Sequence, residues 1–528
     1  MIRSVRLNTL LGILYLLIAA LTVSPAFAND ISWTGAGDGT TWTQAANWSP
    51  AVVPGASNDV FITMSGTYTV LLTASVTINS LTLGGDSGTQ TLRKSNALTL
   101  NNDSRVLSNG VLELLSGYIQ GNGILTNNGI IRIDASNWAG VHTTTLINNG
   151  QIFQDRGLVY IAAGGVLENR GLYRITGDLN ISPSGAMGTF INDGILEKIN
   201  GNTFSTINII IDSRPDSRIQ VSNGSLRLSA NSSYHDMTFH AAAESDQLTL
   251  QSGTHTFRGS ISGEPVGRVI INTETETHEA GATVDFGGRG LHWASSYFRG
   301  GGTLTNAGII RVDANNWAGV HGSTLINEGQ IFQDRGLVYI AAGGVLENRA
   351  LYRITGDLNI SPSGAMGTFI NDGILEKING NTFSTINIII DSRPDSRIQV
   401  SNGSLRLSAN SSYHDMTFHA AAESDQLTLQ SGTHTFRGSI SGEPVGRVII
   451  NTETETHEAG ATVDFGGRGL HWASSYFRGG GTLTNAGIIR VDANNWAGVH
   501  GSTLINEGQI FQDRGLVYIA AGGVLENR

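Results

Sequence analysis

Acidic and basic side chains alternate in the stretch DSRPDSR, which contains Asp212, Arg214, Asp216 and Arg218. Alternate residues of an extended strand lie on one face, and two carboxylates beside two guanidinium groups suit an enzyme that cleaves polysaccharides. Pro215, however, favours a turn within the stretch. A solvated, salt-bridged loop is therefore the interpretation that we favour. The stretch recurs further along, at Asp391, Arg393, Asp395 and Arg397.

Two histidines of SYHDMTFH, His235 and His240, could bind a metal ion. A structural zinc site needs four converging ligands and a catalytic one three, and no third ligand accompanies this pair in the sequence. We therefore predict neither a metal site nor a cofactor.

Three of the eight tryptophans, Trp33, Trp42 and Trp48, lie close together near the N-terminus. Indole rings can stack on sugar rings, and the polar neighbours Asp38 and Asn47 would suit such a binding site. The same rings can instead cover the open end of a stack of strands, which would otherwise invite edge pairing. We favour the cap and keep sugar binding as the alternative.

The elements that position these residues follow from a short repeat of the form L-x-N-x-G. Its glycines are Gly129, Gly150, Gly171 and Gly194, at intervals of 21, 21 and 23 along the chain, and a short aliphatic run follows each. A period near twenty with one strand and one turn per unit is typical of a solenoid. Successive coils then stack at ~4.8 Å and share one core.

The asparagines of this form predict a ladder along the stack. Leu and Asn alternate with residues of the opposite face, so both point inward. We expect the amides to bond from coil to coil, as they do in cross-β structure, although independent surface turns are an alternative. The predicted structural ladder is Asn127, Asn148, Asn169 and Asn192.

A longer repeat is visible in QIFQDRG, which begins at Gln151, Gln330 and Gln509, so that its period is 179. Gly171 becomes Ala350 in the second copy, and a positive φ at this position would make the alanine unfavourable. The chain ends at Arg528 inside a copy, without a polar cap. We therefore expect an interrupted array whose last coil associates through its exposed edge.

These periods predict an all-β fold, a right-handed parallel β-helix (β-solenoid) with an N-terminal Trp-rich capping segment and few helices. The expected divisions are a signal peptide at 1–28, a Trp-rich capping module at 29–100 and a solenoid at 101–528. The solenoid contains the tandem repeat at about 119–297 and 298–476, with a partial copy at 477–528.

Composition limits the partners. Two arginines, an apolar run and Ala26-Phe27-Ala28 are typical of a cleaved signal peptide, so we expect a secreted or cell-surface protein. The formal net charge is −11, and no basic run follows residue 28, which argues against nucleic acid and anionic lipid. No later segment approaches the length of apolar sequence that would insert in a membrane.

The tryptophan-rich segment has the pattern W-x-G-x-x-D-G-x-x-W-x-x-A-x-N-W, followed by V-P-x-x-x-x-D-V. It resembles the N-terminal module of large bacterial autotransporter-like surface proteins. The Asn-Gly-rich array after it is similar to the β-helical passengers of filamentous-haemagglutinin-type adhesins. The motif positions are Trp33, Gly35, Asp38, Gly39, Trp42, Ala45, Asn47, Trp48, Pro54 and Asp59.

The resemblance implies an adhesin of a bacterial cell envelope that binds a surface or a glycan. A rod that extends a binding surface works at any number of copies, whereas an enzyme gains little from copying one long block. We therefore predict a protein that is not an enzyme. The alternatives are a polysaccharide-active β-helix enzyme, either a lyase or a hydrolase, and a passive structural stalk.

Overall fold

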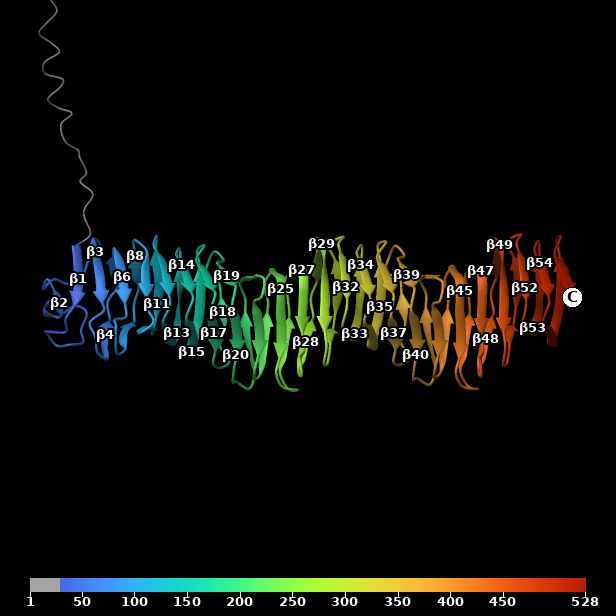
Figure 1. The fold of residues 1–528 in the computed structure, drawn as a ribbon, viewed down its shortest axis with the longest axis horizontal. Helices are drawn as coiled ribbons and strands as arrows, with labels where there is room; N and C mark the ends of the chain where they lie inside the picture. Colours follow the sequence, from blue (N-terminus) through green and yellow to red (C-terminus); the bar gives the residue numbers. More distant parts are fainter. Residues whose placement is uncertain (1–28) are drawn as a thin grey trace, which may run out of the picture.

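The computed structural model describes residues 29–528, which form one long rod with the two ends of the described chain at opposite ends (Figure 1). Apart from one short 3₁₀ segment, η1 (Ala45–Asn47), the regular structure in this range is β, and the chain makes about 22 turns of a β-solenoid. The predicted all-β solenoid is confirmed. No helix in this range is long and apolar enough to cross a bilayer. The expected signal peptide lies outside the described residues.

The first ten strands are β1 (Asn29–Trp33), β2 (Trp48–Ser49), β3 (Asn58–Ile62), β4 (Tyr68–Leu72), β5 (Val76–Ile78), β6 (Ser80–Leu83), β7 (Gln90–Lys94), β8 (Leu98–Leu100), β9 (Ser104–Val106) and β10 (Gly110–Leu114). The strands that follow are β11 (Gly117–Gly121), β12 (Ile124–Asn127), β13 (Ile130–His142), β14 (Thr145–Asn148), β15 (Gln151–Ala162), β16 (Val166–Asn169), β17 (Leu172–Ile175), β18 (Ile181–Ser182), β19 (Thr189–Asn192), β20 (Ile195–Lys198), β21 (Phe204–Ile207), β22 (Ile210–Ser213), β23 (Arg218–Val221), β24 (Ser225–Leu228), β25 (Ser232–Ala241), β26 (Gln247–Leu250), β27 (His255–Gly263), β28 (Arg268–Ile271), β29 (Thr275–Phe286) and β30 (Leu291–Trp293). The strands from β31 (Ser296–Arg299) to β56 (Val524–Asn527) repeat this second series, with a constant offset between counterparts such as Gln151 and Gln330.

Each turn contributes to three parallel ladders, which form the three faces of the rod. Ladder A contains β9, β12 and β14, ladder B contains β10 and the first halves of β13 and β15, and ladder C contains β11 and their second halves. Long strands such as β13 therefore bend round a corner. Leu125, Leu146, Leu167 and Phe190 lie opposite one another in successive turns and are buried. The core is thus a column along the axis of the rod.

The long repeat does not contain a whole number of turns. Ladder A runs from β12 through β14, β16, β19, β22, β25, β27 and β29 to β31, which is eight steps and therefore eight turns. The copy of β12 is the next strand, β32 (Thr303–Asn306), which belongs to ladder B because it pairs with the second half of β29. Each copy is therefore displaced by one face round the rod and by about 40 Å along it.

Buried asparagines form an amide ladder at the four positions where the sequence predicts one. The Nδ2 group of Asn127 donates to Oδ1 of Asn148 at 2.7 Å, and Asn148 donates to Asn169 at 2.8 Å. Asn169 donates in turn to Asn192 at 3.0 Å. The amide of Asn148 also donates to the carbonyl oxygen of Leu172 at 3.1 Å. These bonds satisfy polar groups that the core would otherwise leave unpaired.

The solenoid begins before the boundary expected near residue 100. Ladder A runs from β1 through β3 and β6 to β9, and ladder B runs from β4 through β7 to β10. Residues 34–57 depart from the coil except at Thr41, which pairs in parallel with Leu71 of β4, and they contain η1 and β2, which pairs with β1 in antiparallel fashion. The Asn47 side chain ties this segment together, because it accepts from Gly37 and Gly39 and donates to Asp38. The capping segment is therefore shorter than predicted.

Gly171 occupies its position for a reason other than the predicted one. Its φ is not positive, so the expectation of a left-handed backbone there is wrong. A Cβ atom at this position would instead stand 2.2 Å from the carbonyl oxygen of Gly150 in the neighbouring coil. The constraint is a close approach of two backbones, and Ala350 must accommodate a methyl group at the equivalent place.

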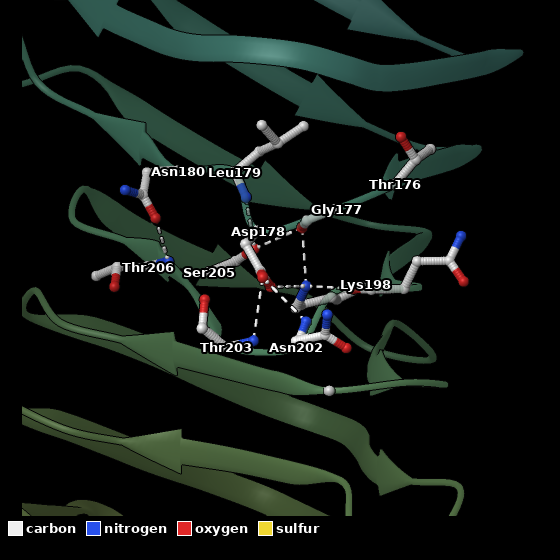
Figure 2. A network of polar contacts seen from close by, with 12 residues as sticks. Thr176, Gly177, Asp178, Leu179, Asn180, Lys198, Asn202, Thr203, Ser205 and Thr206 are labelled. Atoms are coloured by element: carbon white, nitrogen blue, oxygen red, sulfur yellow. Dashed lines mark hydrogen bonds and ion pairs between the residues drawn. The ribbon is translucent and has the colours of Figure 1, made fainter.

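A buried lysine anchors the loop between β20 and β21 (Figure 2). The Nζ group of Lys198 donates to the carbonyl oxygen of Gly177 at 2.7 Å and contacts Oδ1 of Asp178 at 3.2 Å. Oδ2 of Asp178 accepts from the backbone N–H groups of Asn202 and Thr203, both at 3.0 Å. Burial alone would raise the pKa of the Asp178 carboxyl, but the hydrogen bonds from the loop and from the lysine outweigh it and lower the pKa.

Candidate functional site

The tryptophans near the N-terminus are buried, and the structure therefore favours the cap over sugar binding. Trp33, Trp42 and Trp48 are exposed by only 3%, 1% and 2%. Their rings pack edge to face, with centroids 4.9 Å apart for Trp33 and Trp48 and 4.8 Å apart for Trp42 and Trp48. An indole with so little exposed area offers no face to a ligand. The cluster ends the hydrophobic column instead.

The DSRPDSR stretch is a salt-bridged turn. Asp212 lies near the end of β22, whereas Asp216 lies in the turn that follows, with φ +65°. The guanidinium group of Arg214 lies 3.8 Å from Asp212 and 3.6 Å from Glu168. The hydroxyl of Ser233 donates to Asp212 at 2.9 Å. These contacts correspond to the solvated loop that we favoured from the sequence.

The two histidines of SYHDMTFH lie on β25. Nε2 of His235 lies 2.9 Å from a carboxylate oxygen of Asp236. Burial and the nearby Arg218 lower the pKa of His240. Within residues 29–528, no three side chains of the kinds that bind metals converge.

Three other tryptophans lie on the outside of the rod, each between two tyrosines of the adjacent turns. The ring centroid of Trp138 is 4.7 Å from that of Tyr118 and 5.6 Å from that of Tyr160. The rings are partly exposed, and the imidazole of His142 lies 5.1 Å from Tyr118. We call the stack of Tyr118, Trp138 and Tyr160 platform 1. Platform 2 is Tyr297, Trp317 and Tyr339, and platform 3 is Tyr476, Trp496 and Tyr518.

A close approach of two backbones favours glycine in the middle strand of a platform. Gly140 of β13 lies opposite Tyr118 of β11 and Tyr160 of β15. A Cβ atom on Gly140 would stand 2.1 Å from the carbonyl oxygen of Tyr160. In platform 2, a Cβ on Gly319 would stand 2.5 Å from the carbonyl oxygen of Tyr339 and 2.9 Å from the Cε1 atom of the Tyr297 ring. A larger residue would therefore separate the neighbouring strands, and in platform 2 it would also press on the ring of Tyr297.

The surface beside platform 1 is hollowed, with a volume of about 470 Å³. The amide of Asn96 donates to the carbonyl oxygen of Thr73 at 2.5 Å, which orients its own oxygen acceptor. Asn137 is exposed next to Trp138. The hollow is lined by Ser75, Asn96, Ala97, Ser116, Gly117, Tyr118, Asn137 and Trp138.

A flat aromatic surface beside hydroxyl and amide groups has the chemistry to bind a sugar ring. The C–H face of a pyranose packs on an aromatic ring, and its hydroxyl groups need donors and acceptors at the edge. In platforms 2 and 3 an arginine lies over the first tyrosine, with Arg299 at 5.0 Å and Arg478 at 5.1 Å from the ring centroids. Each arginine also forms an ion pair with a glutamate of the rod, at 3.1 Å for Glu274 and 3.0 Å for Glu453, so its charge is balanced within the protein.

A second groove, of about 350 Å³, runs across several coils between Phe204 and Arg335. Its arginines are engaged by the protein itself. Arg268 forms an ion pair with Asp313, Arg335 donates to the carbonyl oxygen of Asp313, and Arg227 lies 3.6 Å from the centroid of Phe204. Because these donors already have partners, we favour the platforms as the functional site.

The platforms were missed in the sequence, although a signal for them exists. The segment NWAGVH occurs at 137–142, 316–321 and 495–500. Period-two alternation places its tryptophan and histidine on the outer face and its alanine and valine in the core. A large aromatic residue on the polar face of a strand, two positions before a glycine, is the pattern that would have indicated a platform.

Comparisons of the chain with known protein families, with curated proteins and with solved structures find no match. The arguments for a function therefore rest on the geometry of the platforms and on the sequence patterns.

Proposed function

We propose that this protein is a secreted, rod-shaped adhesin of a bacterial cell envelope that binds glycans through its three platforms. The observation that carries the proposal is the partly exposed Tyr–Trp–Tyr stack, which recurs once in each copy of the long repeat. The core of the rod does not need these rings, because the adjacent Ala139 and Val141 of the same strand already fill it. Aromatic clusters that remain on a surface are typical of binding sites.

Two sequence patterns support export and a place at the cell surface. One is the expected signal peptide at 1–28, and the other is the resemblance of the tryptophan-rich segment to autotransporter-like proteins. The similarity of the array to filamentous-haemagglutinin-type passengers supports an adhesive role for the rod.

A polysaccharide-active enzyme and a passive stalk are the rival functions. The engagement of Asp212 by Arg214 and Ser233 supports binding without cleavage. A passive stalk needs only the stacked core and would have no use for three aromatic platforms. Both rivals can be distinguished from the adhesin by experiment.

The test uses purified 29–528 and a panel of β-glucan, xylan, alginate and chondroitin sulfate on a sensor surface. We expect at least one polysaccharide to bind. The combined variant Trp138→Ala, Trp317→Ala and Trp496→Ala should bind it about fivefold more weakly at each platform, because each stacked ring contributes ~1 kcal/mol. The control variant, Phe204→Ala with Phe383→Ala, removes two exposed rings that lie outside the platforms and should bind normally.

Equal binding by the triple variant, or binding by no member of the panel, would contradict the proposal. Release of oligosaccharides by the unmodified protein would favour the enzyme instead. That activity should then disappear when Asp212, Asp216 and their copies are changed to alanine.

A further inference from the structure

The three platforms lie on three different faces of the rod. Platform 1 is on ladder C, where β11 pairs with the second half of β13. Platform 2 is on ladder A, on β31 and the second halves of β33 (Ile309–His321) and β35 (Gln330–Ala341). Platform 3 is on ladder B, on β51 (Ser475–Arg478), β53 (Ile488–His500) and β55 (Gln509–Ala520).

This arrangement follows from the length of the repeat. A unit of eight whole turns would align all platforms along one face, about 40 Å apart, as a continuous track for one polymer. The additional third of a turn moves each platform to the next face. A platform returns to the same face only after three repeats, which is ~120 Å along the rod. A straight polymer that lies along one face therefore meets one platform.

We infer that the rod cross-links glycan chains: its platforms hold separate sugar polymers on different sides of the molecule. The inference rests on the proposed function, because it requires that the platforms bind glycans. The partner is a second polymer chain, or a second glycan-coated surface, of the same chemistry as the first. Each further repeat adds a site on the next face, and its coils stack through the same kinds of strand pairing as the coils before them.

The chemistry of the platforms suits this role, because all three have the same Tyr–Trp–Tyr stack and one type of polymer can occupy each of them. A rod with several sites dissociates slowly from a dense surface, since one platform rebinds while another remains bound. This slower dissociation requires that the polymers approach the rod from different directions, as they do in a gel or between two surfaces.

The inference is tested by a sandwich experiment with the full described chain. Biotinylated β-glucan, xylan, alginate and chondroitin sulfate are immobilised in turn, the protein is bound, and beads coated with the same polysaccharide are then added. We expect the unmodified protein to capture beads. The variant Trp317→Ala with Trp496→Ala retains platform 1 alone, so it should bind the surface but capture at least tenfold fewer beads.

The variants Trp138→Ala, Trp317→Ala and Trp496→Ala, made singly, each leave two platforms on different faces and should still capture beads. Two results would overturn cross-linking while leaving the adhesin intact: surface binding by the unmodified protein without bead capture, or equal capture by the protein that retains one platform. Failure to bind any immobilised polysaccharide would overturn both the proposed function and the inference.

Discussion

Two buried histidines should make the stability of the rod depend on pH. His255 is fully buried, with Nδ1 2.9 Å from the hydroxyl of Tyr234 and Nε2 3.1 Å from the carbonyl oxygen of Ser252. A neutral ring that carries its proton on Nε2 satisfies both contacts. Burial lowers the pKa of His255 to about 4, although the bond to Ser252 acts in the opposite direction. The copy, His434, has the same surroundings and the same lowered pKa.

The direction of the pH effect on stability follows from the pKa of each histidine in the folded and the unfolded chain. The unfolded chain takes up a proton on each histidine near pH 6.5, whereas the folded chain does so only near pH 4. The stability from this source is therefore complete above pH 6.5 and is lost as the pH falls toward 4. At pH 5 the loss is about 2 kcal/mol for each histidine, relative to pH 7.5. Carboxyl groups of ordinary pKa titrate mainly below pH ~4.5, outside this window.

Denaturant unfolding, followed by far-UV circular dichroism between pH 7.5 and 5, measures the loss. The variant His255→Gln with His434→Gln should lose the contribution of these two residues, about 2 kcal/mol each, whereas His471, whose pKa burial also lowers to about 4, keeps its own contribution. The matched control, His235→Gln with His414→Gln, removes two more exposed histidines and should keep it. The reasoning is refuted if the unmodified protein is equally stable at both pH values, or if the ring C–H signals of His255 titrate near pH 6.5.

Three further outcomes follow from the contacts within the rod. Asn148→Ala removes the shortest acceptor of the Asn127 amide and the donor to Oδ1 of Asn169, and it should destabilise by about 2 kcal/mol in denaturant unfolding. Asn149→Ala, at an exposed neighbour, should change stability by less than ~0.5 kcal/mol, and similar losses in the two variants would contradict the buried ladder. Lys198→Met removes the charge that anchors the loop after β20 and should lower the free energy of unfolding by about 3 kcal/mol. Amide exchange at Thr203 should become faster, and unchanged exchange there would contradict the role of Lys198 as an anchor. Ala350→Gly should slow hydrogen exchange of the Leu351 amide. This amide donates to the carbonyl oxygen of Gly329 at 3.3 Å, whereas the equivalent bond beside Gly171, from Leu172 to Gly150, is shorter at 3.0 Å. Faster exchange would show that the methyl group is accommodated without strain.

The sequence by itself determined the stack of coils and much of its interior. Alternation within each strand decides which side chains face inward, and the regular spacing of the L-x-N-x-G turns brings like positions together in successive coils. Leu125 therefore lies opposite Leu146, and Asn127 lies opposite Asn148. Both relations are local or strictly periodic, so they can be recognised without coordinates.

Only the tertiary structure decided which aromatic rings are buried and in which direction the repeats face. Trp33 and Trp138 both lie on strands, but the first is covered by the turn at the end of the rod and the second lies on an open face. The close approach that favours glycine at position 171 involves the neighbouring coil and has no signal in the local sequence. The displacement of each copy by one face depends on the sum of many coil lengths. Because the coils differ in length, that sum is known only when every strand has been assigned to its ladder.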